Sequence, residues 1–316
     1  MSRARRYLLV SPCRNEAPYM RRTIESVAAQ TLPPALWVIV DDGSTDETPA
    51  ILAEYSRKLG YLKVARRADR GHRSVGPGVI EAFYHGLETV DLDDFEYLCK
   101  LDLDLVLPPR YFELLIADME ANPRLGTTSG KPYFHAADGS LVPETIGDEV
   151  SVGASKFYRT RCFREIGGFV REVMWDGIDC HRCRMLGWMV QSVDREDLRF
   201  LHLRPMGSSQ QGLWAGRVRA GYGQYFMGTA PVYYVASALF RLFKHPVLYG
   251  SAAMLWGYFS SALRRVPRYE DPAFRRFLRR YQRECLLRGK AEATRRLEAR
   301  QAPVWHAAHP GPGSGA

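Results

Sequence analysis

The sequence predicts an α/β fold in which a mostly parallel sheet is flanked by helices. Short apolar runs, such as residues 7–10 and 36–40, alternate with segments whose apolar residues recur at helical spacing. Each of these runs is followed by a polar cluster. Ligands of parallel α/β sheets bind beyond the carboxyl ends of the strands, so polar clusters at successive strand ends indicate one common crevice.

The predicted strands alternate with predicted helices through the first third of the chain. The strands are residues 7–10, 36–40, 62–65 and a fourth that begins at residue 97. A glycine-bearing loop at residues 70–78 follows the third strand and leads into a helix at residues 79–87. Because a helix follows each strand, we expect these strands to lie parallel in one sheet.

Asp102 and Asp104 stand at the end of the fourth predicted strand, separated by one residue. Two buried carboxylates this close in sequence are costly unless a positive group lies beside them. Mg²⁺ and Mn²⁺ are suitable partners because they prefer carboxylate and phosphate oxygens. A solvated acidic turn is the alternative for an isolated Asp-x-Asp, and the surrounding motifs decide between the two.

Composition places the chain among globular proteins. Its 316 residues are 46% hydrophobic and 25% charged, which suits one large domain or one domain with an appendage. The net charge of +9 is concentrated in residues 264–300, where thirteen Lys and Arg face five Asp and Glu. Cys180 and Cys183 form a lone Cys-x-x-Cys without a second ligand pair, so we expect free thiols there and no zinc.

Ordered motifs carry a resemblance to a known family. Ser-Pro-Cys-Arg-Asn-Glu (residues 11–16), Val-Ile-Val-Asp-Asp-Gly-Ser-Thr-Asp (38–46), the glycine loop and Lys-Leu-Asp-Leu-Asp (100–104) follow one another along the chain. In this order they resemble the family 2 glycosyltransferases, which have the GT-A fold. The resemblance covers about residues 7–210 and implies a Rossmann-like, mostly parallel sheet flanked by helices.

The resemblance also implies a nucleotide-sugar site with a divalent cation. The residues expected to hold the donor are Ser11, Pro12, Asn15, Glu16, Asp41, Asp42, Arg70, Arg73, Gly76, Gly78 and Asp102. Asp104 would bind Mg²⁺ or Mn²⁺, which offsets charge as the nucleoside diphosphate leaves. His202 is a second candidate metal ligand, although a lone histidine is also a common structural residue. A solvated loop is the alternative for Arg70 and Arg73.

The residues around Asp176 resemble the segment that carries the family's general base, with a departure. Trp175 stands where the family usually has a glutamate, and the second aspartate, Asp179, comes one place late. Counting back from Arg182 and Gly187 places Asp176 on the general base and leaves Asp179 as the other candidate. A base is needed because the acceptor hydroxyl loses a proton as it attacks. An acidic helix start remains the structural alternative for both residues.

The last third of the chain differs in character. Residues 231–240 and 246–263 are uncharged, which suits an interfacial hairpin, a membrane span or a helical cap on the protein. Next comes a basic amphipathic helix around residues 274–285. We therefore predict a catalytic domain at 1–215, with its donor half at about 1–105 and its acceptor half at 106–215. A helical, membrane-associating extension would follow at 216–300, and a disordered tail at 301–316.

The sequence as a whole indicates an inverting, metal-dependent hexosyltransferase that adds one sugar at a time. Its donor would be a nucleotide sugar and its acceptor a lipid-linked or glycan hydroxyl, in exopolysaccharide or cell-surface glycan synthesis. The apolar run at residues 7–10 is too short for a signal-peptide core. We expect a cytoplasmic protein, peripheral on the inner face of the cell membrane, without a nucleic-acid partner. The alternatives are a nucleotidyltransferase and a basic protein that binds membranes or nucleic acid.

Overall fold

The structure, a computed structural model, describes residues 5–69, 71, 76–136, 138–204, 212–240 and 249–310. The chain forms two compact units. The first comprises Met1–Arg171 and Met189–Pro205, and the second comprises Glu172–Trp188 and Met206–Ala316. The chain therefore leaves the first unit after Arg171, contributes one segment to the second, and returns at Met189.

The first unit is built on a sheet whose described strands follow the order β10-β6-β9-β4-β1-β2-β3. These strands are β1 (Tyr7–Cys13), β2 (Leu36–Asp42), β3 (Leu62–Arg67), β4 (Tyr97–Leu101), β6 (Leu125–Gly130), β9 (Ser155–Arg159) and β10 (Met189–Val193). β1 pairs in parallel with β2 and β4, and β2 with β3, as the sequence predicts. β9 runs antiparallel to both β4 and β6. The sheet is therefore mostly parallel, with one reversed strand in its interior.

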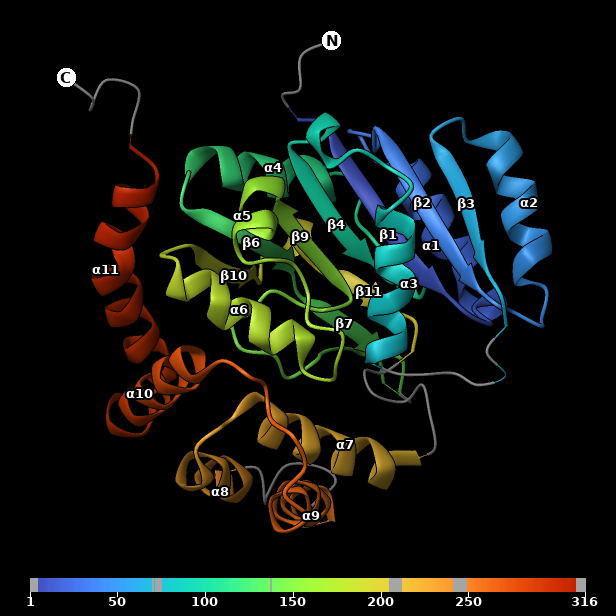
Figure 1. Cartoon of the computed structure of the whole chain (residues 1–316). Helices are drawn as coiled ribbons and strands as arrows, with labels where there is room; N and C mark the ends of the chain where they lie inside the picture. The colour runs from blue at the N-terminus through green and yellow to red at the C-terminus, as the bar shows by residue number, and fades with distance from the viewer. Residues whose placement is uncertain are drawn as a thin grey trace. The chain divides into compact units, whose positions relative to one another are not determined.

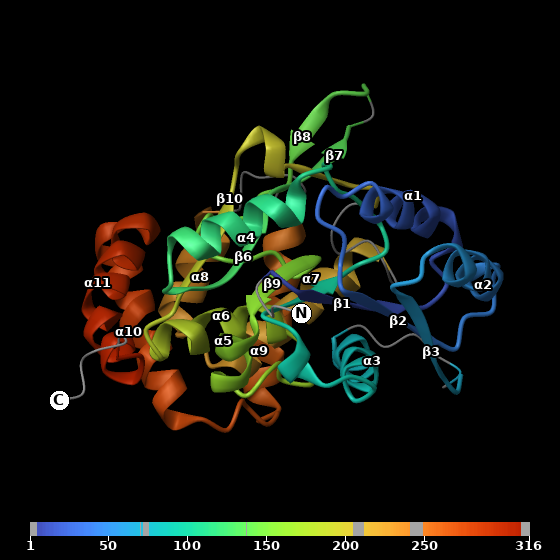
Figure 2. The ribbon, with the colours of Figure 1, turned by 90° about the horizontal axis from the view of Figure 1, so that it is seen from above.

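Helices cover the two faces of this sheet. They are α1 (Ala17–Ala28), α2 (Thr48–Lys58), α3 (Pro77–Leu87), α4 (Tyr111–Ala121) and α5 (Thr160–Glu165), with short 3₁₀ turns η1 (Leu92–Asp94) and η2 (Glu196–Leu198). Figure 2 shows α1 and α4 on one face of the sheet and α3 on the other. A smaller sheet has the order β5-β11-β7-β8. Its strands are β5 (Leu105–Val106), β7 (Pro132–His135), β8 (Leu141–Pro143) and β11 (Phe200–His202).

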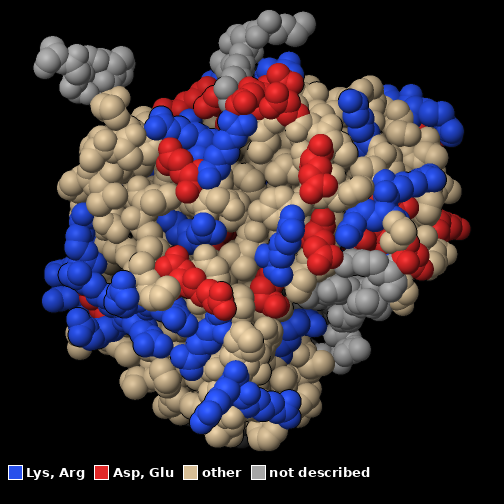
Figure 3. All heavy atoms as spheres, viewed as in Figure 1, with Lys and Arg blue, Asp and Glu red and all other residues tan. Residues whose placement is uncertain are grey.

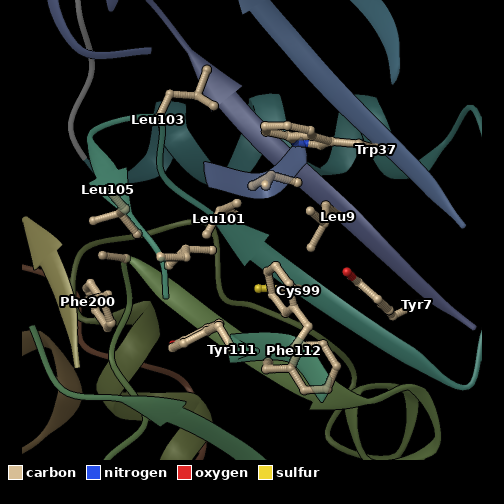
Figure 4. Close-up of a cluster of buried hydrophobic side chains, with 14 of the residues drawn as sticks. Tyr7, Leu9, Trp37, Cys99, Leu101, Leu103, Leu105, Tyr111, Phe112 and Phe200 are labelled. Carbon is tan, nitrogen blue, oxygen red and sulfur yellow. The ribbon is translucent and has the colours of Figure 1, made fainter. Parts of the chain in front are cut away.

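Alternation along the strands divides their side chains between these two faces. Tyr7, Leu9 and Trp37 belong to the large core that includes residues of α1, α2 and α4, part of which Figure 4 shows. Val10 and Val40 point to the other face, where Gly86 of α3 approaches them. A Cβ at Gly86 would lie 2.7 Å from the Val40 Cγ2 atom, so α3 sits close to the sheet because residue 86 has no side chain.

The second unit is helical in its described residues. Its helices are α6 (Trp175–Met185), α7 (Gly212–Met227), α8 (Pro231–Phe240), α9 (Tyr249–Leu263), α10 (Pro272–Arg288) and α11 (Lys290–Ala308), and Figure 1 labels each of them. Within the described ranges, none of the helices has the length and apolar character that a membrane crossing requires.

Two expectations about the C-terminal third need correction. α11 includes residues 301–308, which were expected to begin a disordered tail. The reason is Trp305, which is buried and contacts the Trp188 ring at a centroid distance of 5.7 Å. The amphipathic helix is α10, but its apolar residues Phe274 and Leu278 are fully buried in the protein. Its apolar face is therefore occupied by the second unit itself, not available to a membrane.

Candidate active site

The carboxyl ends of β1, β2 and β4 lie side by side at one edge of the main sheet. This follows from the parallel register, which pairs Cys13 with Asp41 on one side and Val10 with Lys100 on the other. The polar residues that follow these three strands are therefore brought to the same edge. Parallel α/β proteins bind their ligands at such an edge.

The loops after β1 and β2 are tied together by Asn15. Asn15 adopts a left-handed backbone conformation with φ of 54°, and its side-chain oxygen accepts a hydrogen bond of 2.8 Å from the Thr45 N–H. The Asn15 N–H in turn donates to the Ser44 hydroxyl at 2.9 Å. Ser11 is buried, and its hydroxyl accepts a hydrogen bond of 2.9 Å from the Trp37 indole N–H. Pro12 follows it, half-buried, in β1.

Asp41 and Asp42 are buried at the end of β2, and each carboxylate has a fixed partner. Asp41 accepts a hydrogen bond of 2.9 Å from the Ser44 N–H. Asp42 forms an ion pair of 2.9 Å with Arg67, which ends the neighbouring strand β3. These partners hold both carboxylates in one orientation, which suits recognition of hydroxyl or N–H donors of a ligand.

Asp102 follows β4 directly, and Lys100 of the same strand holds its carboxylate. The Lys100 ammonium donates to Asp102 at 2.5 Å and to the Gly153 carbonyl at 3.0 Å. Burial raises the pKa of Asp102 above its ordinary value, against the opposing charge of Lys100. The lysine of the Lys-Leu-Asp-Leu-Asp motif is thus a positioning residue, which the sequence analysis did not single out.

His202 lies beside Asp104 although nearly one hundred residues separate them. β11 pairs antiparallel with β5, and this register places His202 opposite Leu105 and lets the Leu203 N–H donate to the Asp104 carbonyl at 2.8 Å. The His202 Nε2 atom lies 3.6 Å from the Asp104 carboxylate, and Nδ1 lies 3.1 Å from the Glu144 carboxylate. Burial opposes the charged imidazole, but the two carboxylates outweigh it and raise the pKa of His202 to about 9.

Arg204 completes this cluster of buried charges. Its guanidinium donates to the Asp104 carboxylate at 2.8 Å and to the Glu16 carboxylate at 3.1 Å, so it bridges the ends of β4 and β1. Its charged end also lies 5.2 Å from the centre of the Tyr19 ring. Burial would raise the pKa of Asp104, but His202 and Arg204 outweigh burial and lower it.

The sequence analysis missed Arg204 and Glu144. Arg204 had a signal, because the extended segment His202-Leu203-Arg204 places its first and third side chains on one side, where His202 was already a candidate. Glu144 had none, since it lies outside every motif and meets His202 only through the small sheet.

A divalent cation would find carboxylate and imidazole ligands in the cluster of Asp104 and His202. Within the part of the chain that the structure describes, no group of three or more His, Cys, Asp or Glu side chains is arranged to hold a metal. The Oδ1 atom of Asp104, however, is buried and has no hydrogen-bond partner among the described residues. A buried carboxylate oxygen without a donor suits a cation ligand, and the neighbouring imidazole of His202 would be a second ligand once it has released its extra proton.

The glycine loop is described only in part. Arg70 and Arg73 lie outside the described residues. Gly76 has φ of 89°, a conformation that favours glycine, and it immediately precedes α3. Gly78 is buried in the first turn of that helix.

Asp176 and Asp179 both lie on α6, in the second unit. Asp176 is half-buried in the first turn of α6 and does not cap the helix, because Met174 occupies the cap position. Asp179 is 1% exposed, one turn further along. The two candidate bases thus differ in exposure, since Asp176 is half-buried and Asp179 is buried.

Comparisons with known proteins find sequence similarity in the N-terminal part of the chain. The sequence model of Glycosyl transferase family 2 matches residues 9–138. A poly-beta-1,6-N-acetyl-D-glucosamine synthase of Staphylococcus epidermidis is 29% identical over 121 residues, which are 38% of this chain and 27% of that protein. An uncharacterized glycosyltransferase of Rickettsia prowazekii is 43% identical over 54 residues, 17% of either chain. The matched segment therefore spans only about a quarter or less of these curated relatives.

Solved structures share the fold at low sequence identity. A mannosyltransferase of Pyrobaculum calidifontis, in complex with GDP-Man and Mn²⁺, has a TM-score of 0.52 at 20% identity, covering 96% of this chain and 86% of that one. TarS 1–349 of S. aureus in complex with UDP has a TM-score of 0.54 at 16% identity, covering 96% and 92%. The architecture is thus GT-A-like, a mostly parallel sheet flanked by helices with a helical C-terminal region. Residues 9–138 are thus similar in sequence to glycosyl transferase family 2, and the whole described fold is similar to solved glycosyltransferases.

Proposed function

We propose that this protein is a glycosyltransferase that moves a sugar from a nucleoside-diphosphate donor to an acceptor hydroxyl. The observation that carries the proposal is the cluster of buried charges Glu16, Asp104, His202 and Arg204 at the carboxyl ends of β1 and β4. Isolated buried charges are costly, so a cluster at a ligand-binding edge favours a role in binding. The family match and the glycosyltransferase relatives support this reaction class.

The donor site combines the residues that follow β1, β2 and β4. Backbone groups around Ser11 and Pro12, with Asn15, Glu16, Asp41 and Asp42, hold the base and ribose. Asp102, positioned by Lys100, faces the ribose or the sugar. Gly76 and Gly78, with Arg70 and Arg73, approach the diphosphate, for which arginine provides matching donors.

A divalent cation, Mg²⁺ or Mn²⁺, belongs to this proposal. Asp104 would hold it through the buried oxygen that has no partner in the described residues, with His202 as the second ligand. Such an ion offsets the negative charge on the leaving diphosphate. Arg204 supports the same charge balance from the protein, because it already holds the other Asp104 oxygen.

The acceptor side and the stereochemistry are also proposals. We assign the general base to Asp176, which takes the proton of the acceptor hydroxyl in a single, inverting displacement, and keep Asp179 as the other candidate. The partial surface access of Asp176 supports this order. The poly-N-acetylglucosamine synthase relative favours a role in exopolysaccharide or cell-surface glycan synthesis, with a lipid-linked or glycan acceptor at the cytoplasmic face of the membrane.

Calorimetric titration of UDP- and GDP-sugars, with and without MnCl₂, tests the donor proposal. We expect one sugar nucleotide to bind in the presence of Mn²⁺, and Asp104→Asn to lose the Mn²⁺-dependent part of the affinity. Asp197→Asn is the matched control, because Asp197 is exposed and pairs with Arg195 on the surface. Equal affinity of the wild type and Asp104→Asn would refute the metal assignment. Release of pyrophosphate during turnover, in place of a nucleoside diphosphate, would favour a nucleotidyltransferase.

A further inference from the structure

The outer face of α9 is apolar where the surface of a helix is normally polar. Its exposed side chains include Tyr249, Trp256, Phe259 and Leu263, with exposed fractions of 53%, 61%, 40% and 84%. With Ala252, they recur every three or four residues, so they form one stripe along the helix. We call these five residues the α9 stripe. Such a continuous exposed apolar surface marks an interaction site.

The opposite face of α9 explains why the stripe points outward. That face contains Gly250, Ala253 and Gly257 beside the larger Met254 and Tyr258, and it contacts α7 so closely that a Cβ at Gly257 would lie 2.1 Å from the Val218 carbonyl oxygen. A Cβ at Gly221 of α7 would likewise lie 2.1 Å from the Met254 carbonyl oxygen. The large stripe residues do not fit into a contact this close. A rotation of α9 that placed a stripe residue where Gly257 lies would clash with the α7 backbone, so the stripe points away from α7.

Neighbouring residues extend the apolar surface. Trp214 of α7 is 40% exposed, and its ring lies 4.8 Å from that of Tyr249. α8 packs beside α9 through the stacked rings of Tyr234 and Tyr258, 4.7 Å apart, and it exposes Val232. Trp and Tyr are the residues that accumulate at membrane interfaces, because their rings are apolar and carry a polar group.

The charge of this region fits an anionic partner. Residues 206–269, all in the second unit, contain seven Lys and Arg and no Asp or Glu. Arg264 and Arg265 follow Leu263 directly and are exposed. In Figure 3, the surface at the level of α7–α9 carries basic and uncharged atoms. Anionic headgroups attract basic residues that lie next to a buried apolar surface.

We infer that the α9 stripe, with Trp214, Arg264 and Arg265, docks on an anionic phospholipid bilayer. α9 lies in the plane of the interface with the stripe at the boundary between headgroups and acyl chains, and the arginines lie among the headgroups. The inference deepens the proposed function, on which it rests for the lipid-linked acceptor. It keeps the membrane contact on the uncharged run that contains α9 and removes it from the basic helix α10, whose apolar face is buried.

Flotation of the full-length protein with vesicles tests this surface. Vesicles of phosphatidylcholine and phosphatidylglycerol in a 3:1 ratio are compared with pure phosphatidylcholine, at low and high NaCl concentration. We expect the wild type to bind the anionic vesicles, less so at high salt because salt screens the arginines. The Trp256→Glu/Leu263→Glu variant should lose about 90% of this binding, because two carboxylates would enter the apolar boundary. Both side chains are exposed, so circular dichroism should show an unchanged fold.

Leu287→Glu is the matched control. Leu287 lies on α10 in the same unit and is 75% exposed, so it receives the same leucine-to-glutamate exchange as Leu263, outside the stripe. Binding by Leu287→Glu at the wild-type level supports the inference. Equal binding of the wild type and the double variant overturns it, and so does a wild type that fails to float. Light scattering that shows a wild-type dimer and a monomeric double variant, without flotation, would assign the stripe to a second copy and also overturn it.

The vesicle experiment separates this inference from the proposed function. It uses neither donor nor acceptor, so a protein that binds no sugar nucleotide can still show the expected loss in the double variant. Calorimetry on the same variants should give unchanged donor affinity, because no donor-site residue is altered. A wild type that binds no sugar nucleotide but still floats with the vesicles would reject the glycosyltransferase proposal. The inference about the docking surface would then remain supported.

Discussion

Replacing Arg204 with glutamine is expected to destabilise the first unit strongly, because it leaves two buried carboxylates without their shared cation. Arg204 lies 2.8 Å from Asp104 and 3.1 Å from Glu16, and the two carboxylate side chains are only 5% and 6% exposed. Removing one partner of a buried ion pair costs about 3–5 kcal/mol. Arg204 itself is 20% exposed, so we place the cost at the lower end, about 3 kcal/mol.

A loss of this size is measurable by thermal unfolding. For a unit of 150–250 residues, each kcal/mol lowers Tm by about 2–4 °C, so Arg204→Gln should lower it by about 6–12 °C. The matched control is Arg161→Gln, whose ion pair with Glu165 is exposed, and exposed pairs contribute about 0–1 kcal/mol. The control should therefore leave Tm within about 4 °C of the wild type.

A double variant distinguishes the charge effect from lost packing. Arg204→Gln/Asp104→Asn also removes the charge of Asp104, one of the two carboxylates that Arg204 contacts. It should therefore be more stable than Arg204→Gln alone by about 1 kcal/mol or more. Lost packing of Arg204 against the Tyr19 ring would instead destabilise both variants equally. An unchanged Tm for Arg204→Gln, or a double variant less stable than the single one, would refute the reasoning.

Three further variants test other parts of the molecule. Asp176→Asn should lower turnover about 10²–10⁴-fold with donor affinity retained, since only general-base catalysis is removed, and steady-state kinetics with calorimetry will measure both. If Asp179→Asn is the inactive variant and Asp176→Asn is active, the two roles are exchanged. Gly257→Ala should destabilise the second unit by about 1–3 kcal/mol, because the clash with the Val218 carbonyl exceeds the roughly 1 kcal/mol gain in helix propensity; a raised Tm in calorimetry would contradict this. Chelation of divalent ions with EDTA should abolish turnover and Mn²⁺ should restore it, whereas full activity after chelation would exclude the metal role of Asp104.

The strand ends of the first unit could be predicted from the sequence because their signals are local. Apolar runs ending in polar residues mark β1, β2 and β4, and parallel pairing then brings Asp41 and Asp102 to one edge without further information. The predicted fourth strand stops at Leu101, and Leu105–Val106 belongs to the small sheet. That break turns the segment so that Asp104 meets His202, a contact which depends on non-local pairing.

The second unit was harder to predict because a pattern of apolar residues does not say what covers them. The sequence predicts correctly that the apolar residues of α10 share one side of the helix, but it assigns that side to a membrane. In the structure this side is buried in the protein, where Phe274 contacts the His181 ring of α6. The uncharged run 246–263 left span, hairpin and cap open. What fixes the face toward α7 is the position of Gly257, where the two backbones approach closely, and Trp256 then lies on the outer face.

Residues 172–188 belong to the second unit although they lie between two segments of the first in the sequence. The helical region is therefore not a separate C-terminal domain that a truncation could remove cleanly. Within that unit, α6 depends on the C-terminal helices: Gly187 lies so close to α11 that a Cβ there would meet the Trp305 N atom at 2.7 Å, and Arg184 is buried 3.6 Å from Glu298. A chain truncated after residue 225 would lose this cover and expose the helix that carries Asp176. The candidate base on α6 and the proposed bilayer contact on α9 therefore belong to one compact unit, so selection for membrane attachment and selection for catalysis act on the same unit.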